Sequence, residues 1–105
     1  MKKLFETEKL GSLTLKNRLI RSAIWENMAA PGGHPTEKMI AFYEKLASGG
    51  VGLIITGYIA VSKEAGTENG LSGIYDDAFI SEYRRLTDAV HTKGGRIAAQ
   101  IVYRG

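Results

Sequence analysis

Residues that could contact a ligand end or interrupt three apolar segments of the 105-residue sequence. The first segment is followed by Trp25 and Glu26, the second ends in Gly57 and Tyr58, and the third contains Gln100. Gln100 is the most informative of these, because a buried amide without hydrogen-bond partners costs about 1–3 kcal/mol. The sequence leaves two explanations open. Gln100 could contact a ligand, or it could bond to neighbouring polar groups of the protein.

The third apolar segment has two different faces, because side chains alternate along a strand. Its bulky face suits packing against helices and carries Ile97, Ala99 and Ile101. Gln100 belongs to the other face, which suits the inside of a barrel. Gly57, at the end of the second segment, would let another group approach the backbone closely, or it could simply form a turn.

Other polar residues carry weaker chemical signals. Glu26 could act as a base only if it lay buried beside a partner, and Tyr103 could be either a proton donor or a packing residue. His34 lies in a Gly-Gly-His-Pro loop and is expected at the surface. It has no metal-ligand spacing with His91, so we assign no metal. The sequence contains no cysteine, which excludes disulfides and cysteine nucleophiles. No residue is assigned a catalytic role.

The strand signals fall in four places. Residues 4–17 alternate weakly around Gly11-Ser12 and predict a hairpin. Residues 19–24 predict a first main strand, residues 51–57 a second, and residues 96–103 a third. The second is apolar without alternation, which is typical of a parallel strand covered on both faces.

Two helices are predicted between these strands. Thr36 is a candidate N-cap of the first helix, and Gly49 and Gly50 are predicted to end it. Its apolar residues recur at helical spacing, at Met39, Phe42, Tyr43, Leu46 and Ala47. Asp76 or Asp77 can cap the second helix, whose inward stripe contains Phe79, Tyr83, Leu86 and Val90.

The composition is that of an ordinary globular protein, with 44% hydrophobic and 24% charged residues. The net charge is +3, but the basic residues are scattered, so we expect no nucleic-acid partner. The sequence shows neither a signal peptide nor an apolar run of membrane-spanning length, so we expect no membrane partner. The lack of cysteine agrees with a cytoplasmic location. A dinucleotide-binding glycine motif is also absent, which weakens a Rossmann interpretation.

The element order therefore predicts an α/β protein, with an N-terminal β-hairpin followed by β-α-β-α-β. Alternating strands and helices form a parallel sheet with right-handed crossovers. The long loops, residues 25–35 and 58–75, follow strands, whereas the links from helix to strand are only Gly-Gly. Loops after strands carry the function in (β/α)₈ barrels, so this asymmetry favours the first part of a TIM barrel.

Three stretches together resemble the N-terminal portion of the old yellow enzyme family, the NADH:flavin oxidoreductases. They are LFETEKLGSLTLKNRLIRSA, GGHPTEKMIAFYEKLASGGVGLIITG and GIYDDAFISEYRRLTDAVHTKGGRIAAQIVYRG. The resemblance implies a (β/α)₈ barrel that binds FMN at the carboxyl ends of its strands. It also implies hydride transfer from NAD(P)H through the flavin, often to the activated C=C bond of a small unsaturated carbonyl compound.

The resemblance also implies which residues bind the cofactor. One segment would line the flavin ring: Ser22, Ala23, Ile24 and Trp25. Gly57 and Tyr58 match the strand end whose backbone lies near the flavin, and Gln100 matches the glutamine that bonds the pyrimidine edge. Hydrogen bonds there would stabilise charge on the reduced ring.

The sequence departs from the family pattern in identity and in length. Ala23 stands where many members have proline, Trp25 where many have threonine or cysteine, and Tyr103 where many have histidine. A (β/α)₈ barrel needs about 250 residues. We therefore expect residues 1–105 to be the N-terminal fragment of an FMN-binding TIM-barrel domain, incomplete for catalysis by itself. The alternative is a half-barrel without enzymatic activity that self-associates through the exposed edge of its third main strand.

Overall fold

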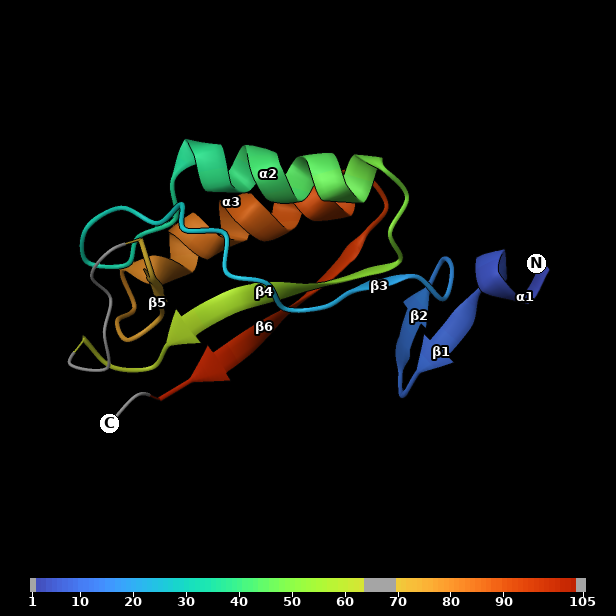
Figure 1. The fold of residues 1–105 in the computed structure, drawn as a ribbon, viewed down its shortest axis with the longest axis horizontal. Helices are drawn as coiled ribbons and strands as arrows, with labels where there is room; N and C mark the ends of the chain where they lie inside the picture. The colour runs from blue at the N-terminus through green and yellow to red at the C-terminus, as the bar shows by residue number, and fades with distance from the viewer. Residues whose placement is uncertain (1, 64–69, 104–105) are drawn as a thin grey trace.

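A four-stranded parallel sheet forms the centre of the computed structural model, which describes residues 2–63 and 70–103 (Figure 1). The strands are β3 (Ile20–Arg21), β4 (Leu53–Ala60), β5 (Ser72–Gly73) and β6 (Arg96–Val102). β4 is the hub of the sheet, because it pairs in parallel with each of the other three. The order β3-β4-β6 follows the sequence and confirms the predicted topology.

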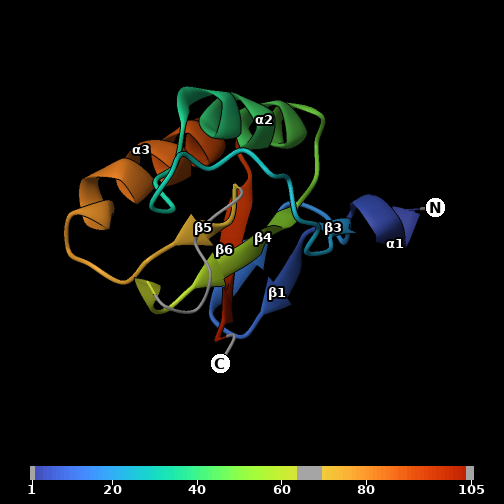
Figure 2. The same cartoon turned by 60° about the vertical axis from the view of Figure 1, so that its left-hand side comes forward.

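Helices α2 (Glu37–Ser48) and α3 (Phe79–Thr92) cover the same face of this sheet. Both lie above β4 and β6 in Figure 1 and remain on that side in Figure 2. Their apolar stripes meet the strands in one buried cluster, which comprises Met39, Tyr43, Ala47, Ile54, Leu86 and Val90. The predicted helical periodicity is thereby confirmed, since the stripe positions are either buried or partly buried against this core.

The helix starts follow from local side-chain hydrogen bonds. Thr36 caps α2 as predicted, because its Oγ1 accepts a hydrogen bond of 3.1 Å from the backbone N–H of Met39. Before α3, Asp76 Oδ1 accepts a hydrogen bond of 2.9 Å from the backbone N–H of Ala78. Gly50, which follows α2, has a φ of +101°, a conformation that glycine adopts without strain.

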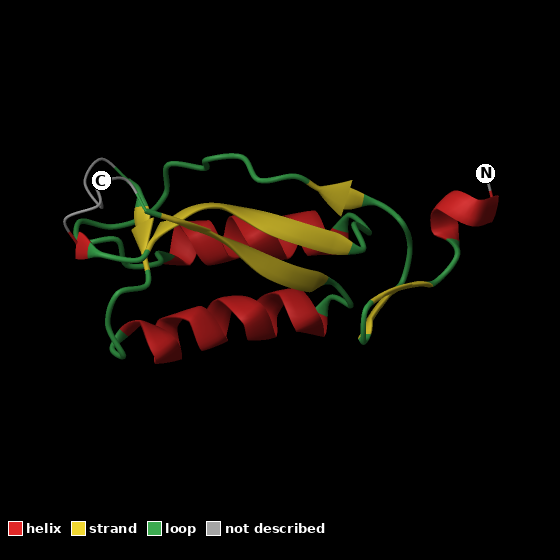
Figure 3. Cartoon of the chain, turned by 90° about the horizontal axis from the view of Figure 1, so that it is seen from below, coloured by secondary structure: helices red, strands yellow, loops and turns green. Residues whose placement is uncertain are grey.

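The predicted hairpin is present as β1 (Glu8–Leu10) and β2 (Leu13–Leu15), which pair antiparallel. A short helix that the sequence did not predict, α1 (Lys2–Phe5), precedes it. Figure 3 shows the hairpin apart from the larger sheet, and in Figure 1 it lies beyond the amino-terminal ends of the parallel strands. It is therefore far from the carboxyl ends, where the candidate site lies.

Asn17 joins the hairpin to the larger sheet. Its side chain is only 7% exposed. Its Nδ2 donates a hydrogen bond of 2.6 Å to the carbonyl oxygen of Gly50, and its Oδ1 accepts one of 3.0 Å from the backbone N–H of Leu19. This amide thus fixes the entry to β3 against the short link between α2 and β4.

The first main strand was predicted at residues 19–24, but β3 comprises only Ile20–Arg21, so the prediction was wrong for residues 19 and 22–24. Two backbone groups of β4 that could pair with a longer β3 form hydrogen bonds to side chains instead. Arg21 Nη1 donates to the carbonyl oxygen of Ile55 at 3.3 Å, and the N–H of Gly57 donates to the Tyr43 hydroxyl at 3.1 Å. The segment after Arg21 therefore runs beside β4 without joining the sheet.

The second strand was predicted at residues 51–57, but β4 begins two residues later and ends three residues later. A two-residue strand, β5, lies within the loop predicted at residues 58–75. Residues 64–69 of that loop lie outside the described residues. Across the described part of the chain, no helix has the length and apolar character needed to cross a membrane.

Candidate functional site

The residues predicted to bind a cofactor meet at the carboxyl ends of β3, β4 and β6. Tyr58 and Gln100 are register partners on β4 and β6, so their side chains leave the sheet on the same side. The backbone of Ile24 and Trp25 lies against Gly57. Three segments that are distant in the sequence thus form one continuous edge.

Large apolar side chains are exposed along this edge. The exposed fractions of Ile24, Trp25 and Tyr58 are 57%, 49% and 44%. Ser22 is exposed as well, and Ala23 is half-buried. Such a group of exposed apolar and aromatic side chains is typical of a surface that binds a ligand or another protein segment.

Gln100 adds a polar group to the same edge. It is half-buried, and its side-chain amide makes no hydrogen bond to any residue that the structure describes. Its backbone N–H donates a hydrogen bond of 3.1 Å to Thr56 Oγ1, which fixes the position of its Cα. The explanation that Gln100 bonds neighbouring polar side chains thus finds no partner among the described residues. Its amide keeps a donor and an acceptor for a ligand.

Gly57 is needed for contact between chain segments. A Cβ at this position would lie 2.5 Å from Glu26 Oε2, 2.7 Å from the carbonyl oxygen of Ile24 and 2.9 Å from the Cα of Trp25. Contacts below 3.0 Å are not tolerated without movement, and two of these atoms belong to the backbone. Gly57 therefore allows a close approach to its backbone and does not simply form a turn. The group that approaches is the segment after β3, which contains Ile24 and Trp25.

Glu26 does have a partner, which the sequence did not identify. The Tyr43 hydroxyl donates a hydrogen bond of 2.7 Å to Glu26 Oε2 and accepts one of 3.1 Å from the N–H of Gly57. Sequence analysis placed Tyr43 only in the apolar stripe of α2. Its residue type could have indicated a polar contact, because a buried tyrosine hydroxyl usually needs a hydrogen-bond partner.

Arg21 was also missed, and it lies behind the same edge. Its Nη2 donates to the carbonyl oxygen of Ile24 at 3.4 Å, while Nη1 reaches Ile55. Its guanidinium carbon lies 5.5 Å from the ring centroid of Phe42 and 5.7 Å from that of Tyr43, within cation–π range. A positive charge is thus fixed next to the segment that follows β3.

His34 and Tyr103 differ from their expected environments. His34 is not simply at the surface: it is half-buried, its ring stacks on Phe79 at 4.4 Å, and its Nδ1 lies 2.7 Å from Glu82 Oε1. The Gly-rich loop is thereby tied to α3. Tyr103 is 70% exposed, so it does not pack as a typical strand-end tyrosine. The residues that the structure describes include no group of three His, Cys, Asp or Glu side chains that could hold a metal ion.

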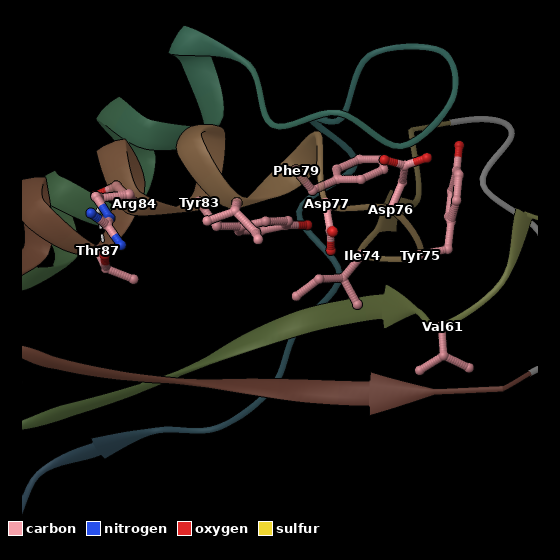
Figure 4. Close-up of a pocket in the computed structure, with 10 residues that line it drawn as sticks. Val61, Ile74, Tyr75, Asp76, Asp77, Phe79, Tyr83, Arg84 and Thr87 are labelled. Atoms are coloured by element: carbon pink, nitrogen blue, oxygen red, sulfur yellow. Dashed lines mark hydrogen bonds between the residues drawn. The ribbon is translucent and has the colours of Figure 1, made fainter.

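A groove of about 830 Å³ lies elsewhere, between the first turns of α3 and the end of β4 (Figure 4). Its walls include Val61, Ile74, Ile80 and Tyr83. None of the seven predicted cofactor-binding residues lines it. It lies on the helix side of the sheet, so we do not assign the predicted chemistry to it.

Comparison with known proteins finds relatives along nearly the whole chain. A family model described as "NADH:flavin oxidoreductase / NADH oxidase family" matches residues 3–105. A metal reductase of Desulforamulus reducens is 37% identical over 102 residues, which cover 97% of this chain and 15% of the relative.

Solved structures show the same fold. The old yellow enzyme from Trypanosoma cruzi matches 99% of this chain with a TM-score of 0.88 and 38% identity, and 28% of that enzyme is covered. Morphinone reductase in complex with tetrahydroNAD matches 97% of this chain with a TM-score of 0.85 and 33% identity, and 27% of it is covered.

The chain thus spans less than a third of the length of each of these proteins. The β-α-β-α-β arrangement after the hairpin corresponds to the first part of a (β/α)₈ barrel, as predicted. Because the family model extends over nearly the whole chain and the fold agrees with it, the chain belongs to the NADH:flavin oxidoreductase / NADH oxidase family.

Proposed function

We propose that this chain is the N-terminal part of an FMN-dependent NAD(P)H oxidoreductase of the ene-reductase type, and that residues 1–105 contribute to its FMN-binding domain. One observation carries the proposal. An exposed apolar edge, formed by Ile24, Trp25 and Tyr58, adjoins the side-chain amide of Gln100, which bonds to none of the described residues, at the carboxyl ends of parallel strands.

These residue types fit an isoalloxazine ring. A flat heterocycle with an apolar body needs an apolar or aromatic surface, and its pyrimidine edge needs both a donor and an acceptor. Ile24, Trp25 and Tyr58 would supply the surface, together with Ser22 and Ala23 of the same segment. The Gln100 amide would supply the donor and the acceptor. Gly57 would keep the backbone of the β4 end close to the ring.

When bound, FMN would supply the redox chemistry, taking a hydride from NAD(P)H and passing it to the activated C=C bond of a small unsaturated molecule or a related acceptor. The chain's own residues would orient the ring and exclude water from its covered face. The side-chain NH₂ of Gln100 would donate a hydrogen bond to the polar edge of the ring and so favour negative charge there. The described residues include no group to which we assign proton transfer, so the chain alone is proposed to be incomplete for catalysis.

The test begins with the protein expressed from its natural gene and desalted. We expect it to remain yellow and to oxidise NADH or NADPH in the presence of an acceptor. Gln100→Leu, which loses the amide at similar size, should raise the Kd for FMN about tenfold, since two hydrogen bonds are removed. The matched control is Ile101→Val, one residue along β6 on the opposite face, which should leave this Kd unchanged. Equal Kd values for the two variants would contradict the proposed site.

A second candidate function is structural self-association, and the outer edge of β6 favours it. Among the described residues, β6 pairs only with β4, and Ile101 on its helix-facing side is 51% exposed. An unpaired strand edge can serve as a template for another chain. Sedimentation of the 105-residue chain should then show an oligomer that Ile101→Lys disrupts. Leu10→Lys, on the distant hairpin, should not disrupt it, and a clean monomer at high concentration would contradict this candidate.

The remaining expectations are still predictions from composition. They are a cytoplasmic location and the lack of nucleic-acid and membrane partners. A small-molecule substrate is proposed from the family alone.

A further inference from the structure

The Tyr43 hydroxyl lies between two backbone segments of the proposed flavin-binding surface, the segment after β3 and the end of β4. Tyr43 is fully buried in the core between α2 and the sheet. Its hydroxyl contacts the side chain of Glu26, from the segment after β3, and the backbone N–H of Gly57, from β4. One atom of the helix layer therefore joins two segments that have no sheet pairing with each other at this point.

The contact with β4 falls at an irregularity of the sheet. Ile55 is paired with Ala98, but the next pair is Tyr58 with Gln100. Two residues of β4, Thr56 and Gly57, therefore lie opposite a single residue of β6, which is the arrangement of a β-bulge. A bulge turns a backbone N–H away from the regular ladder, and here Tyr43 accepts the hydrogen bond from Gly57.

The bulge decides which way Tyr58 points. Side chains alternate along a strand, so the extra residue in β4 brings Tyr58 to the same side of the sheet as its register partner Gln100. Thr56 Oγ1 accepts the N–H of Gln100 at 3.1 Å, which fixes the same irregularity from the β6 side. The hydrogen bond between Tyr43 and Gly57 therefore lies at the bulge that places Tyr58 beside Gln100.

Two charged groups lie close to Tyr43, one at its hydroxyl and one over its ring. Glu26 accepts its hydroxyl hydrogen, and the Arg21 guanidinium lies 5.7 Å from its ring centroid. Burial, with a further contribution from Glu26, raises the pKa of Tyr43 to about 12. Tyr43 thus keeps its proton and remains a hydrogen-bond donor to the Glu26 carboxylate throughout the physiological pH range.

We propose that Tyr43 is a positioning residue for the flavin-binding surface. Its hydroxyl bonds both Glu26 and Gly57, and so holds the Ile24–Glu26 segment in a fixed position against the β4 bulge. This inference rests on the proposed function for the identity of the ligand. Tyr43 itself touches no ligand in this scheme, because its hydroxyl is occupied by Glu26 and Gly57 and its ring lies on the helix side of the sheet.

The first test needs no cofactor. Amide hydrogen exchange at Gly57 is measured by NMR in cofactor-free protein expressed from its natural gene. Tyr43→Phe, which removes only the hydroxyl, should accelerate this exchange about tenfold, as expected for one lost hydrogen bond. The matched control is Tyr83→Phe, because the Tyr83 hydroxyl also donates to a part-buried backbone group, the carbonyl oxygen of Gly73, at 2.7 Å. It should leave Gly57 exchange unchanged.

A second pair of variants applies if Tyr43→Phe fails to fold. Glu26→Ala removes the acceptor of the Tyr43 hydroxyl, whereas Glu26→Gln retains an acceptor oxygen at the same place. We expect Glu26→Ala to raise the Kd for FMN about tenfold and Glu26→Gln to stay within about threefold of the unaltered protein. A purely structural role of residue 26 would not give this rescue by the amide.

The outcomes distinguish the positioning role of Tyr43 from the proposed FMN-binding function. Unchanged Gly57 exchange in Tyr43→Phe, or equal Kd values in the two Glu26 variants, would overturn the positioning role even if FMN binds. A lack of FMN binding by the unaltered protein would instead overturn the proposed function. Faster exchange confined to Tyr43→Phe, together with rescue by Glu26→Gln, would support the inference.

Discussion

Gly57 and Ile24 lie so close together that a Cβ on Gly57 would be 2.7 Å from the Ile24 carbonyl oxygen. This contact brings the segment after β3 against the end of β4, where no strand pairing holds it. It also brings Trp25 to the edge that contains Tyr58 and Gln100. The proposed ligand surface therefore depends on a glycine that makes room for the protein backbone.

Gly57→Ala should destabilise the protein by about 2–3 kcal/mol, because the added methyl group overlaps backbone atoms that cannot rotate away. Chemical unfolding measures this free energy. Gly49→Ala is the matched control: its Cβ would come no closer than 3.4 Å to the backbone, and its φ of −74° suits alanine. The control should change the free energy of unfolding by less than about 1 kcal/mol, and equal losses in both variants would show that close approach is not the cause.

We expect the protein to lose stability at alkaline pH because of two tyrosines, Tyr43 and Tyr83. Burial raises the pKa of Tyr43 to about 12 and also raises the pKa of Tyr83. Below pH 10, folded and unfolded chains both keep these protons, so the stability is fully present. Above pH 10 the unfolded chain loses them first, and the free energy of unfolding falls as the pH rises toward 12.

For Tyr43 the loss is on the order of 2 kcal/mol between pH 10 and pH 12. Urea unfolding at pH 8, 10, 11 and 12 measures it. Tyr43→Phe cannot ionise at this position, so its free energy of unfolding should fall less steeply over the same range. Parallel pH curves for the variant and the unaltered protein would rule out this contribution of Tyr43.

Asn17→Ala should cost about 2–3 kcal/mol, because it leaves the Gly50 carbonyl and the Leu19 N–H without their side-chain partner in a buried place. Thermal or chemical unfolding gives the value. Asn17→Asp keeps the acceptor for Leu19 but loses the donor to Gly50. It should therefore leave Leu19 amide exchange close to that of the unaltered protein, whereas Asn17→Ala should accelerate it. A loss below about 0.5 kcal/mol for Asn17→Ala would contradict the anchoring role.

Thr36→Ala should cost about 1–2 kcal/mol, since it removes the N-cap of α2 and a second hydrogen bond, from Thr36 Oγ1 to the Met28 carbonyl oxygen at 2.6 Å. Thr36→Ser retains the hydroxyl and should recover most of this free energy of unfolding. Chemical unfolding of the three proteins makes the comparison. A serine variant as unstable as the alanine variant would assign the effect to the lost methyl group instead.

Much of the fold follows from local sequence signals. The apolar stripes of α2 and α3, the Thr36 cap and the Gly-Gly links specify helices and their ends, because these interactions act within a few residues. The unalternating run before Gly57 specifies a covered parallel strand. Gln100 could be singled out in the same way, as an amide in an apolar strand.

Other features are decided by contacts between distant residues, which no local pattern records. β3 ends early because Arg21 and Tyr43 take hydrogen-bonding groups near Ile55 and Gly57. His34 is half-buried because its ring stacks on Phe79, the first residue of α3.

The sequence by itself determined the order of the elements, the helix faces and the residues worth testing as ligand contacts. The tertiary structure decided that Gly57 accommodates the Ile24–Glu26 segment and that the core tyrosine of α2 bonds Glu26. It also decided that Tyr58 and Gln100 share one edge. The physical reason is the bulge in β4: one extra residue resets the side-chain alternation, and its hydrogen bonds are completed only when a helix and two strands are already packed together.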